Sequence, residues 1–214
     1  MEASLLVPRS KVSPKIVAAH HAAIKLGSAK YPICRTEVRS FALAQNLRST
    51  NVDNVVYGQL PRRIIIFMTS NSAYNGTYAS NPFEFKHYNL KHLSAYVDVQ
   101  MYPPQPFTPE FSGGIFTREY ISNFLALNQY GTDATCTMSL KDYEKLPVFV
   151  INFAPDRSDG YGLAEHVNPI RRGNLSLNLA FSEPLPEAIN VGVYMEFDNM
   201  FEIDKDGVVS LDYM

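Results

Sequence analysis

One segment of the chain alternates strictly between apolar and polar or small side chains. Within residues 174–181 every second position is apolar, namely Leu175, Leu177, Leu179 and Phe181. Successive side chains of a β-strand point to opposite faces, so this spacing predicts a strand with one buried face and one exposed face. The chain must therefore build a sheet that covers a core with one of its two sides.

Further strand patterns occur on both sides of this segment. They fall at residues 31–42, 63–68, 93–99, 148–153, 190–197, 201–203 and 208–211, and the last follows the turn residues Asp206-Gly207. Strands follow strands and do not alternate with helices, which disfavours a parallel α/β fold. We expect about eight strands in an all-β fold, arranged as an antiparallel sandwich of two sheets.

Two segments have helical periodicity. The first begins at Ser13-Pro14, a cap followed by a proline that suits the first helical position, and ends at Gly27. The second is expected over residues 117–130, with Tyr120, Phe124 and Leu127 on its inner face. Residues 101–109 contain four prolines and are expected to form a surface loop, because proline cannot donate a hydrogen bond to a strand ladder.

The composition indicates a globular chain with few charges. Apolar residues make up 46% of the 214 residues and charged residues 19%, with 26 Phe and Tyr and a net charge of −2. No apolar run approaches the roughly 18 residues of a membrane-spanning helix, and the balanced charge argues against an electrostatic grip on nucleic acid. We expect one domain with an appendage, and a surface of which part meets other protein.

The cysteines and the N-terminus indicate a protein that is not secreted by a classical signal. The first residues, 1–11, lack the basic start and apolar stretch of a signal peptide. Cys34 and Cys136 fit no metal-binding spacing and are interpreted as two reduced, buried thiols, with one long-range disulfide as the alternative.

No residue pattern points to catalysis, a cofactor or a metal. Adjacent His20 and His21 point about 100° apart on a helix and make a poor chelating pair. Residues 202–207 resemble the start of a calcium loop but lack its twelfth-position carboxylate, so a hairpin turn is the better interpretation. The acidic residues and His166 in the 155–169 loop are interpreted as solvated charge. We therefore predict a protein that is not an enzyme.

Several segments together resemble one family. They are residues 29–33 (AKYPI), 58–63 (GQLPRR), the turn Asn75-Gly76, 81–90 (NPFEFKHYNL), 183–186 (EPLP) and 193–199 (VYMEFDN). In this order, over nearly the whole chain, they resemble the C-terminal half of the double jelly-roll major capsid (hexon-like) proteins, in particular those of Polinton/Maverick elements and adintoviruses, copies of which lie in animal genomes.

This resemblance implies an eight-stranded jelly roll over residues 29–214, with one inserted helix. It makes residues 1–28 a remnant strand and connector helix of an absent first roll. In the family, three two-roll subunits form a pseudo-hexagonal capsomer. The implied partners are therefore copies of this chain, with a trimer favoured, or a separately encoded first jelly roll, and the implied location is a virion or virus-like particle; unassembled chains are expected inside the cell. No membrane or specific nucleic acid is expected as a partner.

Such a protein is expected to function through the surfaces with which it contacts its neighbours. Candidate interface anchors are aromatic, aliphatic and Met residues around Pro- and Gly-rich backbone, because such residues concentrate in interface cores: Met101, Tyr102, Phe107, Phe111, Ile115 and Phe116. The alternative for each is that it caps an end of the sandwich. Arg171 and Arg172 could pair with a neighbour's acidic rim. Two functions follow: a structural capsid-type protein that self-associates, or a domesticated host protein that uses the jelly roll to bind a partner or ligand.

Overall fold

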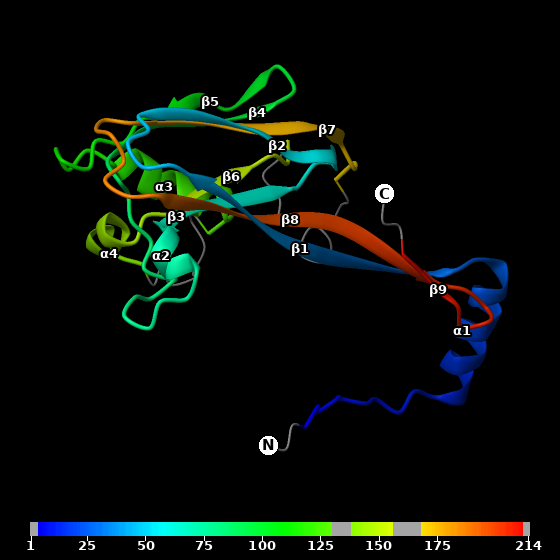
Figure 1. Cartoon of the computed structure of the whole chain (residues 1–214). Helices are drawn as coiled ribbons and strands as arrows, with labels where there is room; N and C mark the ends of the chain where they lie inside the picture. Colours follow the sequence, from blue (N-terminus) through cyan, green and yellow to red (C-terminus); the bar gives the residue numbers. More distant parts are fainter. Residues whose placement is uncertain (1–3, 130–137, 156–167, 212–214) are drawn as a thin grey trace. The chain divides into compact units, whose positions relative to one another are not determined.

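The computed structural model describes residues 4–129, 138–155 and 168–211 of the chain. These residues form four helices and nine strands (Figure 1). In chain order they are α1 (Pro14–Leu26), β1 (Ala29–Leu43), β2 (Ser49–Gln59), β3 (Arg63–Ser70), α2 (Asn71–Tyr74), β4 (Leu90–Val97), β5 (Gln100–Phe107), α3 (Thr117–Ala126), α4 (Leu140–Lys145), β6 (Phe149–Asn152), β7 (Arg172–Phe181), β8 (Ile189–Ile203) and β9 (Val209–Leu211).

The chain divides into two compact units. The larger unit holds residues 34–199 and the smaller one combines residues 1–33 with residues 200–213. Strands β1 and β8 are each 15 residues long and contribute residues to both units. The domain boundary at residue 28 remains a prediction.

The larger unit has the strand order of a jelly roll. One sheet has the order β1-β8-β3-β6, and the other has the order β2-β7-β4-β5. The first strand thus neighbours the eighth, the second the seventh, the third the sixth and the fourth the fifth, as in one long hairpin rolled into two layers (Figure 1). This nested antiparallel order confirms the predicted jelly-roll sandwich.

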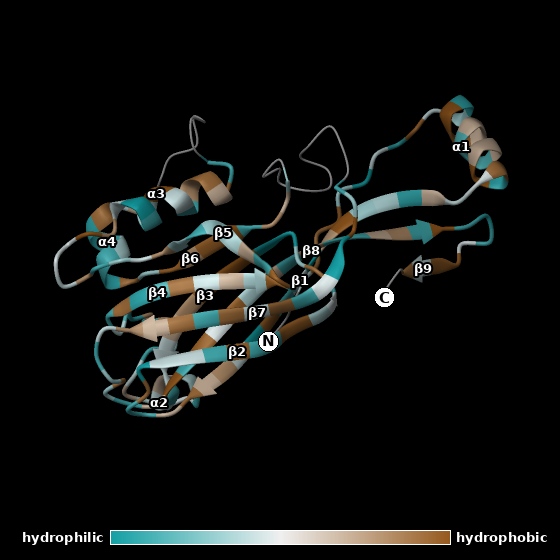
Figure 2. Ribbon diagram, turned by 90° about the horizontal axis from the view of Figure 1, so that it is seen from above, coloured by the Kyte–Doolittle hydropathy of each residue, from teal (hydrophilic) through white to brown (hydrophobic). Residues whose placement is uncertain are grey.

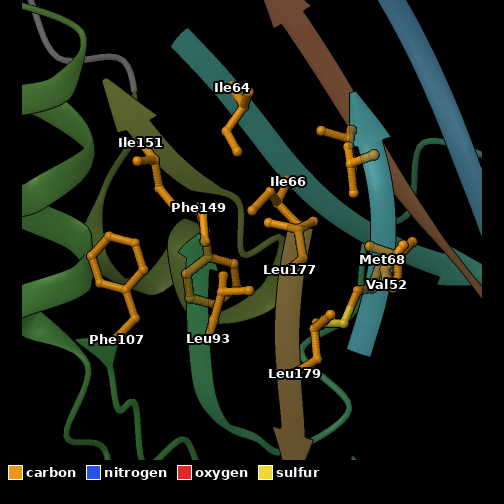
Figure 3. Close-up of a cluster of buried hydrophobic side chains, with 14 of the residues drawn as sticks. Val52, Ile64, Ile66, Met68, Leu93, Phe107, Phe149, Ile151, Leu177 and Leu179 are labelled. Atoms are coloured by element: carbon orange, nitrogen blue, oxygen red, sulfur yellow. The ribbon is translucent and has the colours of Figure 1, made fainter. Parts of the chain in front are cut away.

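Apolar side chains from the two sheets meet in a single core. The alternating residues of β7 supply one side of it, and Leu175 and Leu179 have no exposed surface. Residues of β3 supply the other side, with Ile64 fully buried and Ile66 nearly so (Figure 3). The alternation of β7 therefore has the physical role that the sequence predicted for it, because its odd-numbered side chains point into the sandwich.

The structure corrects two of the sequence predictions about strands. Residues 49–59 form β2, which the sequence pattern did not reveal, because a register shift between Val52 and Val56 interrupts the alternation. Residues 100–107 form β5, not a loop. It pairs with β4 at the edge of its sheet, and its register shifts between the Leu93–Phe107 and Ala95–Tyr102 pairs. An edge strand with such an irregularity tolerates prolines because one side of its backbone needs no partner.

The helices differ in detail from their predictions. Helix α1 begins at Pro14 as predicted, and Asn75-Gly76 forms the predicted turn, with φ of +87° at Gly76. Helix α3 ends at Ala126, and its buried residues include Glu119 and Asn123, whereas the predicted inner residues Tyr120, Phe124 and Leu127 are half-buried. Two short helices, α2 and α4, were not predicted as helices. Residues 4–13 belong to no helix or strand.

Candidate interaction surfaces

The described histidines and acidic residues are the side chains considered as candidates for a metal site. Within residues 4–129, 138–155 and 168–211, no group of three or more His, Cys, Asp or Glu side chains could hold a metal ion. His92 hydrogen-bonds the Ser94 hydroxyl at 3.2 Å. The Asp204 carboxylate accepts the N–H groups of Asp206 and Val208, so residues 204–208 form the predicted hairpin turn. The acidic residues and His166 of the 155–169 loop lie outside the described residues.

Cys34 contradicts the prediction of a buried thiol. It is a free cysteine and is exposed, because it lies on the outward face of the edge strand β1. Its Sγ lies 3.9 Å from Nη2 of Arg62. Cys136 lies outside the described residues.

Three of the predicted interface anchors belong to the core of the protomer. Phe107, Phe111 and Phe116 are each less than 8% exposed. The rings of Phe111 and Phe116 stack with their centroids 5.2 Å apart, and Phe107 packs on Phe149 at 6.0 Å. These three side chains therefore follow the alternative interpretation, in which they close the sandwich. Their aromatic side chains made them resemble interface residues in the sequence, because the cores of domains and of interfaces have similar compositions.

The other five predicted interface residues retain exposed surface. Ile115 is 64% exposed, at a turn where its backbone bridges Glu110. Tyr102 meets Phe153 edge to face at 5.3 Å, and Nη2 of Arg171 donates to the Tyr102 hydroxyl at 3.4 Å. Met101 and Arg172 lie on β5 and β7 and are half-buried and exposed, respectively. An interface role for these residues remains a prediction, and the structure brings Tyr102 and Arg171 together.

A buried ion-pair cluster lies at one end of the β1-β8-β3-β6 sheet. Arg62 is 8% exposed, and its guanidinium contacts Glu196 at 2.9 Å and Asp198 at 3.2 Å. Arg63 contacts the same Glu196 carboxylate at 2.8 Å. A shallow pocket beside it is lined by residues 59–62, 153–155, 168–171 and 198. This cluster could not be predicted from sequence spacing, because more than 130 residues separate the arginines from their acidic partners. Its ion pairs connect the start of β3 to β8.

Charged and polar side chains lie at β1 and β6, the two outer strands of this sheet. On β1 the residues Arg35, Glu37 and Arg39 carry paired charges along the face that also carries Phe41 and Leu43, and Arg39 donates to the Val55 carbonyl of β2 at 2.7 Å. On β6 the side chain of Asn123 occupies the position of a neighbouring strand. Its amide donates to the Val148 carbonyl at 2.8 Å and its oxygen accepts the Val150 N–H at 2.9 Å. Such devices oppose the pairing of an edge strand with another chain.

The smaller unit exposes most of its apolar side chains. None of its described residues is buried, although Tyr31 stacks on Phe201 at 4.8 Å and Lys30 lies 3.5 Å from Glu202. A hydrogen bond from the Ser28 hydroxyl, followed by the charge of Lys30, holds the pKa of Glu202 below its usual value. Large apolar residues that are at least 40% exposed in this unit are Leu5, Leu6, Val7, Val12, Ile16, Val17, Leu26, Tyr31, Val208, Val209 and Leu211. Large exposed apolar patches are commonly found where proteins contact other molecules.

No helix in the described part of the chain is both long enough and apolar enough to span a membrane.

Comparisons with known proteins identify one curated relative and several solved structures. No protein-family model matches the sequence. An uncharacterized protein of Caenorhabditis elegans is 26% identical over 179 residues, which are 82% of this chain and 42% of that protein. The chain therefore spans less than half the length of this relative.

The solved structures are of viruses and of a virus capsid protein. A chain of the Sputnik virophage superposes with a TM-score of 0.49 and 15% identity, over 87% of this chain and 39% of that chain. The PBCV-1 virus capsid gives 0.48 and 13%, over 87% and 52%. The mavirus major capsid protein gives 0.40 and 13%, over 86% and 41%.

Proposed function

We propose that this chain is a structural, capsid-type protein of viral or transposon ancestry that works by associating with copies of itself. Two independent features support this proposal. The nested strand order of the larger unit is that of a jelly roll, and residues 81–90 (NPFEFKHYNL) and five other segments resemble the second roll of double jelly-roll capsid proteins of the Polinton/Maverick and adintovirus lineage.

The exposed smaller unit is the observation that carries the proposal. The smaller unit contains about half of the exposed large apolar side chains of the described chain, but under a quarter of the described residues. Burial of apolar surface stabilises by about 25 cal/mol per Å². Covering these side chains with another protein would therefore stabilise the complex by several kcal/mol. A surface of this kind favours association over an independent monomer.

The proposed partners are other copies of the chain, in a trimer, or a separately encoded first jelly roll that covers the exposed smaller unit. In either case the location of the assembled protein is a virion or virus-like particle. No step of this function requires a catalytic residue or a cofactor.

Sedimentation velocity of the full chain over a range of concentrations tests the proposal. We expect oligomers, and we expect the double variant Leu5→Asp/Leu6→Asp to sediment as a smaller species because it places charge on side chains that are 88% and 90% exposed. The matched control is Val99→Asp, which changes a 97% exposed residue of the larger unit. Negative-stain microscopy of the same samples should show rings or shells. A monomer at every concentration, with Kd above the millimolar range, would rule out self-association.

A further inference from the structure

The outer face of the β2-β7-β4-β5 sheet carries an unusual set of side chains. Antiparallel pairs place residues on the same face, so the pairs Ser176–Tyr96, Asn178–Ser94 and Ala180–His92 define the outward positions of β7 and β4. The pairs Asn51–Asn178 and Ser49–Ala180 extend this face onto β2, and Tyr96–Met101 extends it onto β5. Figure 2 looks down on this sheet, and along β7 brown bands alternate with paler and teal ones.

The centre of this face has no formal charge. The chain is 19% charged, and a solvated sheet face ordinarily uses Lys, Glu and similar residues. Here the central positions hold only Ser, Asn, Ala, His, Tyr and Met. Charged residues surround it instead: Lys91 lies next to the irregularity of β4, Arg172 is at the first position of β7, and Asp53 lies on the edge strand β2, at the register shift opposite Ser176. A neutral centre with a charged rim is the pattern of a protein interface.

Two hydrogen bonds join polar side chains within this face. The Asn178 amide donates to the Asn51 side-chain oxygen at 2.6 Å, and His92 bonds the Ser94 hydroxyl at 3.2 Å. Covering polar groups that keep their hydrogen bonds costs little, whereas covering unpaired ones costs about 1–3 kcal/mol each. Exposed or half-buried Tyr57, Tyr96 and Met101 supply the larger contact surfaces.

We propose that this face is where a second copy of the chain docks, with the two copies related by a two-fold axis so that the face packs on itself. A two-fold interface brings each residue near the axis against its own equivalent, so a face can pair with itself only where it does not oppose like charges. Its neutral centre meets this condition. Four strands about 4.8 Å apart and about eight residues long cover roughly 500 Å² per copy, and the total of about 1,000 Å² reaches the size of a specific interface.

This inference rests on the proposed self-association and names a contact for it that is separate from the exposed smaller unit. A two-fold contact through this face, added to a trimer contact elsewhere, would link trimers to one another. Two different symmetric contacts on one subunit are what an extended or closed assembly needs.

Charge substitutions at Ser176 test the proposal. Ser176 is half-buried at the middle of β7, between β2 and β4. We expect Ser176→Glu and Ser176→Lys each to weaken association about tenfold or more in sedimentation equilibrium, because each places like charges against each other across the axis. An equimolar mixture of the two variants should regain the association, because opposite charges then meet. Thr36→Glu is the matched control, an exposed outward residue of β1 on the other sheet, and it should associate as the wild type does.

The outcomes separate this inference from the proposed function. If the wild-type chain associates and both Ser176 variants associate equally well, the face is open to another occupant and this inference is wrong, while self-association stands. If the variants dissociate but their mixture does not recover, the face does not pack on itself and the inference is also wrong. If the wild-type chain is a monomer, the proposed function fails first. Circular dichroism and thermal unfolding of each variant establish that it folds.

Discussion

Gly192 lies on β8 opposite Phe67 of the neighbouring strand β3. A Cβ atom at this position would overlap the Phe67 ring, which itself packs on Phe85 with 4.5 Å between centroids. The Phe67 ring can therefore approach the β8 backbone this closely only because Gly192 has no side chain. This contact sets the position of the Phe67 and Phe85 rings over this part of the sheet.

We expect Gly192→Ala to lower the free energy of unfolding by about 1–3 kcal/mol, because the Phe67 ring must move from its packed position. Urea denaturation measures the loss. Combining Gly192→Ala with Phe67→Leu should cost less than the sum of the two single changes, since they relieve the same overlap. Gly27→Ala, where nothing lies within 4 Å of the added atom, is the control. Equal losses for Gly192→Ala and Gly27→Ala would contradict the steric account.

His87 gives the chain a stability that depends on pH. Its ring stacks on Phe111 at 4.4 Å, and its Nδ1 accepts the N–H of Asn89 at 2.9 Å, which requires this nitrogen to be unprotonated. Burial lowers the pKa of His87 below its ordinary value of 6.5, and the Glu144 carboxylate opposes this to a lesser extent. Because the unfolded chain then binds a proton more readily than the folded chain, stability falls as the pH falls through the ordinary pKa.

We expect the wild-type chain to lose more unfolding free energy between about pH 7.5 and about pH 5.5 than His87→Phe, which keeps the aromatic stacking but cannot titrate. Denaturant unfolding at the two pH values gives the comparison. His20→Gln, which removes an exposed histidine of α1, is measured alongside as the control substitution. The account of His87 would be wrong if His87→Phe lost as much stability on acidification as the wild type.

Helix α3 protects the edge of the jelly roll at β6. Asn123 is 4% exposed, and its side chain pairs with β6 through one donated and one accepted hydrogen bond. A second amide, that of Asn152 on β6, donates to the Ala126 carbonyl at the end of the helix at 3.1 Å. The helix thus satisfies backbone groups that would otherwise be free to pair with another strand.

We expect Asn123→Leu to cost about 2–4 kcal/mol, because a buried carbonyl and a buried N–H lose their partners together. The variant should also aggregate more readily below its unfolding temperature, since its β6 edge is uncovered. Thermal unfolding with light scattering measures both effects. Ile121→Ala, a 41% exposed residue of the same helix, should change stability by less than about 1 kcal/mol. A neutral Asn123→Leu would show that the helix does not protect this edge.

The elements that the sequence revealed are those whose side chains keep one period throughout. Strand β7 has an uninterrupted alternation, and α1 has both a cap and a proline at its start, so both could be predicted. Strand β2 could not, because Asp53 and Asn54 fall at a register shift. The prolines of β5 concealed a strand that pairs on one side only.

The inner face of α3 was misjudged for a related physical reason. Apolar periodicity selected Tyr120, Phe124 and Leu127, whereas the most buried positions hold Glu119 and Asn123, which hydrogen-bond the backbone of other segments. Local patterns do not report such long-range polar contacts. The same limit applies to the candidate interface, where Phe111 and Phe116 resembled partner-binding residues but lie in the core.

At the scale of the whole molecule, two features point the same way. The larger unit is a nest of eight strands around a continuous core. The smaller unit has no buried residue in its described part, and the proposed function has another chain cover its apolar side chains. Exposed apolar surface of this kind is what the proposed association would bury.

The molar mass of the full chain, measured by light scattering over a concentration series at low and at high salt, tests this account most directly. The account predicts multiples of 24.1 kDa that increase with concentration. It also predicts that high salt does not reduce them, because contacts between apolar and neutral surfaces are not screened. A constant mass of 24.1 kDa at every concentration and salt would contradict it.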